Sequence, residues 1–401
     1  MLSLDEARER LLARARPTDA ETVQLGSASG RVLADPRVVA TVNVPPFANS
    51  AMDGYAIRAA DGPGALTVVG ESAAGARQVP DVTAGTAVAI ATGAPLPAGA
   101  DTVVPVEDVE VQGDTLIVRH AVRDGSHVRA AGHDTRAGDE ICLPGELTPA
   151  MIAVLASLGL GRVEVRRRPR VAVVSTGDEL VEPGEPLGPG QIHDANGVAL
   201  AAAVTDAGGE PILLPRVRDE SGPTEDALTA AAGLAELVVA SGGVSVGRRD
   251  HVRAVLERRG SLDFWRIAVQ PGKPLAVGEL DGTTVIGLPG NPVSALVTFE
   301  LFVRPFIRAM LGLGSDGRAR LRARVKTRIE KDRARRAFLR VRLWREGDEI
   351  HAASAGGQAS SQLRPMADAN AFLVVPEGDE AAEPDRTYEA IVLAPILESP
   401  G

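Results

Sequence analysis

The 401-residue sequence contains one cysteine, few aromatic residues and no long apolar run. The single cysteine, Cys142, excludes an internal disulfide and suits a reducing compartment, so we expect a cytoplasmic protein. The N-terminus is predicted to form a charged amphipathic helix rather than a signal peptide, with Ser3 and Glu6 spaced as a capping box. The apolar stretch at residues 151–160 is shorter than the ~18 residues of a membrane-spanning helix, so we expect no membrane insertion.

The net charge of −10 and the aromatic content of 3% argue against general affinity for nucleic acid, which requires basic surfaces and stacking rings. A basic run at residues 318–345 is interpreted instead as the solvent-facing side of alternating strands. An anionic small ligand stays compatible with the net charge, because local charge and bound metal decide its affinity. The histidines at positions 120, 127 and 133 are not spaced as zinc ligands, and neither a Ser/His/Asp triad nor a P-loop is present.

Strands and helices alternate in the middle of the chain, from about residue 170 onward. Strands are predicted at residues 171–174, 211–217, 237–240 and 264–269, and helices at residues 196–207, 224–232 and 250–259. This alternation is typical of a doubly wound, mostly parallel sheet. In such sheets ligands bind beyond the carboxyl ends of the strands, so the loops that follow the strands are the first places to search for a site.

The flanking regions have a different pattern, and a length of 401 residues favours two to four domains. Residues 41–134 are rich in Val, Thr, Gly and Pro, which predicts a small β domain. From residue 318 onward arginine alternates with apolar residues. Strand patterns at 338–343 and 349–352 flank a turn at 346–348, which predicts a C-terminal β barrel or sandwich. The expected fold class is therefore multidomain α/β plus β.

Acidic residues follow several of the predicted strands. Glu179 comes after the first strand, Asp219 after the second and Asp250 after the third. Parallel strands gather their carboxyl ends at one edge of the sheet, where carboxylates and phosphate oxygens are suitable ligands for Mg²⁺. A simpler alternative is that each acid caps the helix that follows it. For several acids beside glycine-rich loops, we favour a binding site.

Two glycine-containing loops follow strands of the same predicted sheet. The loop SGGVSVG at residues 241–247 lets backbone N–H groups approach a ligand closely. In GLPGNPVS at residues 287–294, Asn291 is placed as a helix N-cap and Pro292 as the first helical residue. A helix start of this kind suits an anion, to which Lys273 adds a mobile charge. An ordinary capped helix is the alternative interpretation of the same pattern.

Six short motifs occur together along the chain: NSAMDGYA at 49–56, TGAP at 92–95, STGDEL at 175–180, SGGVSVG at 241–247, PGKP at 271–274 and GLPGNPVS at 287–294. In this order they resemble the molybdopterin molybdenumtransferase family, which includes the gephyrin E domain, and the resemblance covers most of the chain. It implies insertion of molybdenum from molybdate into adenylylated molybdopterin, with help from Mg²⁺ and release of AMP.

The resemblance also implies a four-domain, elongated homodimer. The implied domains are an elongated domain split between residues 1–40 and 135–168, an inserted β domain at 41–134, a molybdopterin-binding domain at 169–316 and a C-terminal β barrel at 317–401. The active cleft is expected between the pterin domain of one subunit and the inserted domain of the other. Expected partners are a molybdopterin adenylyltransferase and the molybdoenzymes that accept the cofactor.

The resemblance assigns site residues through the matching motifs. Those expected to be catalytic are Asp53, Thr92, Asp134, Glu179, Asp219 and Asp250. Those expected to hold Mg²⁺ are Glu179, Asp219 and Asp250. Those expected to bind the pterin, its phosphate or the oxyanion are Ser175, Thr176, Gly177, Ser241, Gly242, Gly243, Ser245, Gly247, Arg266, Lys273, Pro289, Gly290, Asn291, Pro292, Ser294, Arg129, Arg340 and Ser360.

The sequence departs from the family pattern at a few positions. Gln270 and Arg266 stand where many relatives have lysine. Either Lys273 and Arg266 supply the missing charge, or the affinity for anions is lower. Ala359 and Ser361 also differ from one common family form.

Two other functions share parts of this pattern. An adenylyltransferase that activates molybdopterin with ATP has the same pterin-binding domain, but it usually stands as one compact domain. A non-catalytic scaffold is the other alternative, and the full set of acids argues against it. The sequence leaves the choice between molybdate and tungstate open.

Overall fold

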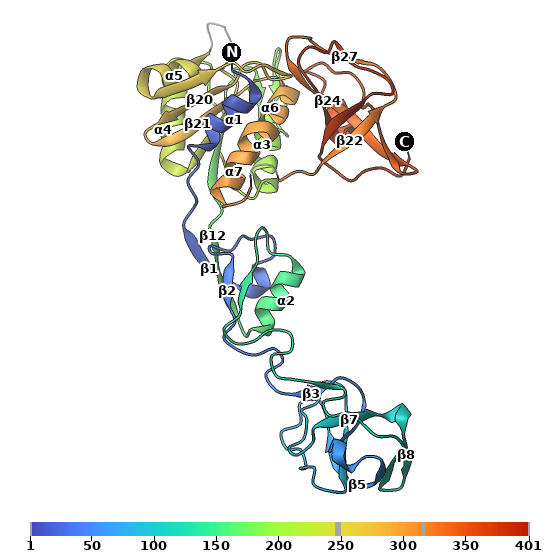
Figure 1. The fold of residues 1–401 in the computed structure, drawn as a ribbon. Coiled ribbons are helices and arrows are strands. Elements are labelled where there is room, and N and C mark those ends of the chain that lie inside the picture. Colours follow the sequence, from blue (N-terminus) through green and yellow to red (C-terminus); the bar gives the residue numbers. More distant parts are fainter. Residues whose placement is uncertain (1, 245–249, 315–316, 400–401) are drawn as a thin grey trace. The chain divides into compact units, whose positions relative to one another are not determined.

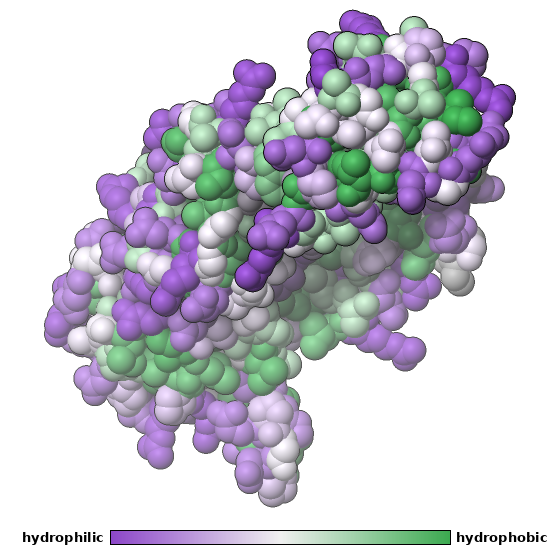
Figure 2. All heavy atoms as spheres, turned by 90° about the horizontal axis from the view of Figure 1, so that it is seen from below, coloured by the Kyte–Doolittle hydropathy of each residue, from purple (hydrophilic) through white to green (hydrophobic). Residues whose placement is uncertain are grey.

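A computed structural model describes residues 2–244, 250–314 and 317–399, and the chain forms two compact units (Figure 1). The first unit joins residues 1–21 to residues 166–401, and the second consists of residues 22–165. Two predicted site residues, Ser245 and Gly247, lie outside the described residues. In the described ranges no helix is long and apolar enough to cross a membrane. Figure 2 shows hydrophilic residues over most of the visible face, with smaller hydrophobic areas between them.

A six-stranded sheet forms the centre of the α/β part of the first unit. Its strands lie in the order β16 (Glu210–Leu213), β13 (Arg170–Ser175), β17 (Leu237–Ser241), β21 (Thr283–Leu288), β20 (Ala276–Leu280) and β18 (Ser261–Trp265). The first four strands are parallel, and β20 runs antiparallel to both of its neighbours. β17 is buried along its whole length, as expected for a parallel strand covered on both faces. The prediction of a mostly parallel sheet is confirmed.

Helices cover both faces of this sheet (Figure 1). α4 (Ser221–Leu234) and α5 (His251–Arg259) pack on one face, over a core of Val, Leu and Ala side chains that they share with β13, β17 and β20. On the other face, α3 (Ala195–Asp206) contacts α6 (Pro292–Thr298) and α7 (Arg304–Met310). Two helical layers around one sheet make this a doubly wound fold, as predicted.

The N-terminal helix α1 (Leu4–Leu12) belongs to the same unit. It packs against α7 and against the π-helical segment η4 (Phe299–Val303) that precedes α7. The predicted capping box is present, since the Glu6 N–H donates to the Ser3 hydroxyl at 3.2 Å and the Ser3 N–H donates to the Glu6 carboxylate at 3.0 Å. The predicted N-terminal helix is therefore confirmed.

The C-terminal residues form a closed β barrel. Its strands are β24 (Arg336–Glu346), β25 (Glu349–Ser354), β22 (Arg320–Val325), β28 (Thr387–Val392) and β26 (Ala371–Val375), and β26 pairs back to β24. Alternate residues of β24 line the barrel core, which is the expected period of a strand with one buried face. β19 (Val269–Gln270) pairs in parallel with β24 and so joins the α/β part to the barrel. The prediction of a barrel is confirmed.

The second unit contains a six-stranded sheet within the β-rich region that the sequence predicts. Its order is β7 (Thr102–Pro105), β4 (Gly54–Ile57), β6 (Thr86–Ile90), β5 (Gly64–Ser72), β9 (Thr115–Val118) and β8 (Val109–Gln112). Other elements of this unit are β2 (Arg37–Val39), β3 (Asn49–Ser50), β10 (Val128–Arg129), β11 (Glu140–Cys142) and α2 (Pro149–Ser157). The loops between these short strands carry the two motifs expected in this region.

Two predicted strands of the α/β part are wrong in their extent. The strand predicted at 211–217 is shorter, because β16 ends at Leu213. The strand predicted at 264–269 is divided, because β18 ends at Trp265 and Arg266 has a φ of 81°. An L-residue in this left-handed conformation cannot continue a strand, so the chain turns there before it enters β19.

Candidate active site

A cavity of about 650 Å³ lies at the carboxyl ends of β13, β17 and β21. This is the edge of the sheet at which doubly wound folds bind their ligands. Its lining combines glycine-rich backbone, carboxylates and small polar side chains. The predicted residues that line it are Thr176, Glu179, Asp219, Ser241, Gly242, Gly243, Asp250, Pro289, Gly290, Asn291 and Pro292. The fold therefore brings motifs that are far apart in sequence to one cavity.

The glycine turn after β17 comes very close to the loop after β13. Gly242 and Gly243 have φ values of +95° and +65°, which glycine adopts without strain. A Cβ atom at Gly242 would lie 2.7 Å from the hydroxyl of Thr176 and 2.8 Å from its carbonyl oxygen. Any larger residue at position 242 would push the two loops apart. The close approach of the two loops therefore requires glycine at this position.

Three of the predicted acids line the same cavity. Two of them, Asp219 and Asp250, do not cap the helix that follows them. Glu179, Asp219 and Asp250 come from the loops after β13, β16 and β17. Asp250 occupies the N-cap position of α5, but its side chain makes no capping hydrogen bond. Asp219 lies one residue before Glu220, which is the N-cap residue of α4. The position of these carboxylates at the cavity therefore favours a role in binding.

The three carboxylates fit one mode of Mg²⁺ binding. Among the residues that the structure describes, no group of three His, Cys, Asp or Glu side chains is arranged to hold a metal ion alone. Mg²⁺ commonly takes only one or two carboxylates from a protein and completes its octahedron with water and substrate phosphate oxygens. Carboxylates that line a ligand cavity suit this shared coordination, in which the substrate supplies part of the coordination shell.

Asn196 is a site residue that the motifs did not reveal. It lies in the first turn of α3, which begins at the N-cap Asp194. Its Nδ2 donates to the Ser241 hydroxyl and to the Gly290 carbonyl oxygen, both at 2.8 Å. One amide thereby joins the loops after β17 and β21. The only sequence signal was an asparagine at the start of a predicted helix, which is common in helices that bind nothing.

The loop after β21 is joined to the C-terminal part of the chain through Asn291 and Ser360. Asn291 is the N-cap residue of α6 and Pro292 its first residue, as predicted. The Asn291 side chain does not cap the helix, however, and its Nδ2 donates to the Ser360 hydroxyl at 3.0 Å. The Val293 N–H also donates to the Ser360 carbonyl oxygen at 3.3 Å. Ser361, the next residue, lines the cavity.

Arg340, in β24 of the barrel, holds the backbone of residues 357–359, which precede Ser360. Its side chain is 1% exposed, and it donates to the carbonyl oxygens of Gly357 at 2.8 Å and Ala359 at 3.1 Å. Its buried Nε has no partner among the described residues, and burial lowers the pKa of Arg340. The Gln358 amide bonds to both backbone groups of Arg340, at 3.0 and 2.9 Å. Arg340 and Gln358 thus fix the backbone that presents Ser360.

Gln270 and Arg266, the two positions expected to depart from the family pattern, are engaged outside the cavity lining. The Gln270 side-chain oxygen accepts from the Asp332 N–H at 2.7 Å. The guanidinium of Arg266 stacks on the Trp265 ring, 3.9 Å from its centroid. Lys273 is exposed and precedes Pro274, which lines the cavity. Lys273 is therefore the cation of this segment nearest in sequence to the lining.

Three further predicted residues lie outside the lining but next to it in sequence. Ser175 is buried at the end of β13, and its hydroxyl has no partner among the described residues. The Gly177 N–H donates to the Val217 carbonyl oxygen at 3.1 Å. Ser294 is buried within α6, where its carbonyl accepts from the Thr298 hydroxyl at 2.7 Å. The Gly177 contact joins two loops and the Ser294 contact lies within α6, and none of the three residues lines the cavity.

In the second unit, Asp53 and Thr92 are brought together from two separate motifs. Thr92 donates its backbone N–H at 2.6 Å and its hydroxyl at 2.7 Å to the same carboxylate oxygen of Asp53. These hydrogen bonds, the backbone one first, lower the pKa of Asp53. Both residues are exposed to solvent. The pair therefore presents an ionised carboxylate at the surface of this unit.

The other two residues predicted in this unit lie on neighbouring segments. Arg129 in β10 pairs with Asn49 in β3, the strand that begins the first of the two motifs. Asp134 is exposed, and its N–H donates to the Val44 carbonyl oxygen at 2.9 Å. The backbone pairing thus places Arg129 beside the loop that carries Asp53.

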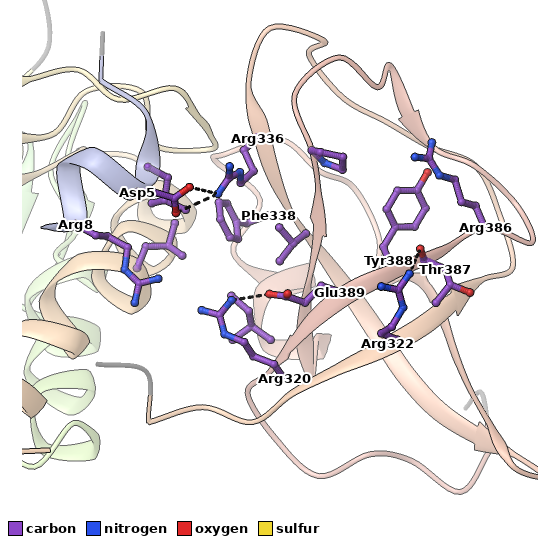
Figure 3. Close-up of a pocket in the computed structure, with 15 residues that line it drawn as sticks. Asp5, Arg8, Arg320, Arg322, Arg336, Phe338, Arg386, Thr387, Tyr388 and Glu389 are labelled. Carbon is purple, nitrogen blue, oxygen red and sulfur yellow. Dashed lines mark hydrogen bonds and ion pairs between the residues drawn. The ribbon is translucent and has the colours of Figure 1, made fainter. Parts of the chain in front are cut away.

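A second cavity, of about 400 Å³, lies between α1 and the barrel (Figure 3). Several arginines line it, and Figure 3 shows Arg336 paired with Asp5 and Arg320 paired with Glu389. The shortest distances in these ion pairs are 3.2 and 2.5 Å. None of the six sequence motifs contributes a residue to this cavity. The cavity at the sheet edge is therefore the candidate active site.

The whole chain is similar to proteins of one family. It matches three family descriptions in order: "MoeA N-terminal region (domain I and II)" at residues 2–159, "Probable molybdopterin binding domain" at residues 172–309 and "MoeA C-terminal region (domain IV)" at residues 322–393. A solved structure of the molybdopterin biosynthesis moeA protein of Pyrococcus horikoshii is similar with a TM-score of 0.85 and 33% identity, and the match covers 98% of this chain and 100% of that one.

Two curated relatives are named as molybdopterin molybdenumtransferases. Molybdopterin molybdenumtransferase 2 of Mycobacterium tuberculosis (strain ATCC 25618 / H37Rv) is 40% identical over 370 residues, which cover 89% of this chain and 91% of that protein. The molybdopterin molybdenumtransferase of Haemophilus influenzae is 39% identical over 382 residues, which cover 94% of both chains. With its motifs, its fold and these similarities, the chain belongs to the molybdopterin molybdenumtransferase family and is a transferase of molybdenum cofactor biosynthesis.

Proposed function

We propose that this protein inserts molybdenum from molybdate into adenylylated molybdopterin and releases AMP. The cavity at the sheet edge carries the proposal, because Glu179, Asp219 and Asp250 line it together with two glycine-containing loops. Its volume of about 650 Å³ suits a small organic ligand. The names of the relatives from Mycobacterium tuberculosis and Haemophilus influenzae support the same class of reaction.

Each part of the lining has a proposed task in this reaction. The turn at Gly242 and Gly243 positions the pterin or its phosphate end through backbone N–H groups, and Asn196 holds this turn against the loop after β21. Water attacks the phosphoanhydride of the adenylylated pterin, so AMP leaves and the other phosphate stays on the pterin. One oxygen of molybdate leaves as water with the two protons of the pterin dithiol that takes up the molybdenum. Mg²⁺, which the acids of the cavity would hold, supplies neutralisation of the phosphate charge. Lys273 and Ser360 are proposed to contact the anion, and Arg340 is proposed to hold the backbone that presents Ser360.

The proposal extends to the assembly. From the family resemblance we propose a homodimer in which Asp53, Thr92, Arg129 and Asp134 of one subunit act with the pterin domain of the other. The ionised, exposed carboxylate of Asp53 supports this role, because it is available to a second molecule. We also propose the four-domain division at residues 1–40 with 135–168, 41–134, 169–316 and 317–401, a cytoplasmic location, and exchange with an adenylyltransferase and acceptor molybdoenzymes.

The test is AMP release from adenylylated molybdopterin by the purified protein with Mg²⁺, with and without molybdate. Molybdate-dependent release that is lost in Asp53→Ala and Asp250→Ala is the expected result. Asp348→Ala, in the exposed turn between β24 and β25, is the matched control and should behave as the unchanged protein does. Pterin binding without AMP release would indicate a carrier or scaffold. ATP consumption with unmodified pterin would instead indicate the activating adenylyltransferase.

A further inference from the structure

A hydrogen bond from its side chain joins Trp265 to the glycine turn of the site, in addition to the backbone hydrogen bonds of the sheet. Trp265 is the last residue of β18, the edge strand, whereas Val244 follows β17. The indole Nε1–H donates to the Val244 carbonyl oxygen at 2.8 Å. β21 and β20 lie between β17 and β18 in the sheet order. A side chain from the edge of the sheet therefore reaches the loop of a central strand.

Two arginines hold the indole ring in place. The guanidinium of Arg253 lies 3.8 Å from the ring centroid of Trp265, and that of Arg266 lies 3.9 Å from it. Arg253 is itself fixed on α5, where its Nε donates to the Glu257 carboxylate at 2.9 Å. Arg266 has a φ of 81°, a conformation that is rare for a bulky residue and that is kept only where its surroundings hold it. The position of the indole is thus fixed by Arg253 on α5 and by Arg266 in the turn after β18.

Backbone hydrogen bonds hold the two glycines, from the Gly242 N–H to the Leu288 carbonyl oxygen at 3.1 Å and from the Arg253 N–H to the Gly243 carbonyl oxygen at 3.5 Å, and side chains hold the next residue, Val244. Gly242 and Gly243 precede it, and glycine can adopt more backbone conformations than any other residue. The Val244 side chain is 2% exposed, and a Cβ atom at Gly287 would lie 2.5 Å from its Cγ1. Packing on Gly287 holds the side chain, and the indole N–H holds the carbonyl. Val244 also lines the cavity, so both contacts act directly on the site.

We propose that Trp265 is a positioning residue that holds the glycine turn in its ligand-binding conformation, and that its indole reports whether the cavity is occupied. The identity of the ligand rests on the proposed function, whereas the hydrogen bond does not. A turn that is ordered before the ligand arrives loses less conformational freedom on binding, so affinity rises while the chemical step is unaffected. Phenylalanine keeps a smaller aromatic ring for Arg253 and Arg266 but lacks the N–H, so Trp265→Phe removes the hydrogen bond.

The first test compares Trp265→Phe with Trp344→Phe in the full-length protein. These are the two tryptophans of the chain, and Trp344 lies in β24 of the barrel. Loss of one hydrogen bond weakens binding about five- to tenfold. The Kd for molybdopterin and the KM for adenylylated molybdopterin should rise by that factor in Trp265→Phe, with kcat within about twofold of the unchanged protein. Trp344→Phe should change neither constant. An unchanged Kd in Trp265→Phe would overturn the proposal, as would a lower kcat at unchanged KM.

The second test follows the emission of Trp265 itself, and Trp265→Phe enters it only as the control. In Trp344→Phe the indole emission comes from Trp265 alone and should change when molybdopterin is added. In Trp265→Phe the remaining emission of Trp344 should stay constant. If the unchanged protein binds no molybdopterin, the proposed function fails, and the hydrogen bond is then judged by NMR. The Trp265 indole N–H should be protected from exchange with solvent, and rapid exchange would overturn the inference by itself.

Discussion

The side-chain amide of Asn196 donates at 2.8 Å to both the Ser241 hydroxyl and the Gly290 carbonyl oxygen. Ser241 ends β17, and Gly290 follows β21, the next strand in the sheet. The two loops belong to different motifs, and this side chain from α3 bonds to both of them, in addition to the hydrogen bond from the Gly242 N–H to the Leu288 carbonyl oxygen. A binding surface made of separate loops depends on such hydrogen bonds between the loops for its shape.

Replacement of Asn196 should therefore impair the reaction more than it impairs folding. Asn196→Ala removes two hydrogen bonds of about 1 kcal/mol each, so kcat/KM for AMP release should fall about tenfold or more. Asn370→Ala is the contrasting control, since it removes the bonds from the Asn370 amide to Leu343 and Pro395 in the barrel. It should lower the Tm and leave kcat/KM of the folded protein unchanged. Equal losses of kcat/KM in the two variants would contradict a role for Asn196 in the site.

The second prediction concerns the pKa of Asp53. Because Thr92 bonds to the charged carboxylate, the pKa of Asp53 is lowered, with the backbone bond as the first cause. The ionised form is then kept below the usual pKa of an aspartate and is lost only as pH falls through the lowered folded-state value. Thr92→Val removes the hydroxyl bond alone, so the pKa of Asp53 should rise part of the way to its usual value.

The measurement is a ¹³C NMR titration of the aspartate carboxyl signals in the unchanged protein, in Thr92→Val and in Thr92→Ser. Thr92→Ser keeps a hydroxyl and should titrate as the unchanged protein does. The acidic limb of the rate profile for AMP release should move upward in pH in Thr92→Val. A titration midpoint of Asp53 that is the same in all three proteins would show that the hydroxyl bond has no electrostatic effect.

The backbone conformations that the site requires could be predicted from the sequence, but the side-chain hydrogen bonds that join its loops could not. The positive φ of Gly242 and the helix start at Pro292 are local backbone features, so a motif reveals them. Asn196 and Trp265 act through contacts with loops that are distant along the chain. The alternation of strands and helices predicted the sheet, but the positive φ of Arg266 depends on its surroundings and divided one predicted strand.

The third prediction concerns Mg²⁺. If Asp219 and Asp250 hold the ion together with substrate phosphate, Asp219→Asn and Asp250→Asn should raise the Mg²⁺ concentration for half-maximal AMP release about tenfold or more. The neutral amide keeps the size of the side chain, so folding should change little. Asp348→Asn, in the exposed turn of the barrel, is the matched control. An unchanged Mg²⁺ dependence in both site variants would remove these acids from the proposed metal site.

The last prediction tests whether one site is built from two subunits. Asp53→Ala and Asp250→Ala should each abolish AMP release as homodimers. In a mixed dimer, one of the two sites would combine the intact Asp250 of one subunit with the intact Asp53 of the other, so about half of the activity per dimer should return. The mixed dimer is isolated by co-expression with two different affinity tags, and AMP release is measured as for the unchanged protein. If both residues served a site within one subunit, the mixed dimer would stay inactive, because each subunit lacks one of them. A mixed dimer of Asp219→Ala and Asp250→Ala is the matched control, since both residues belong to the pterin side and no intact site can form.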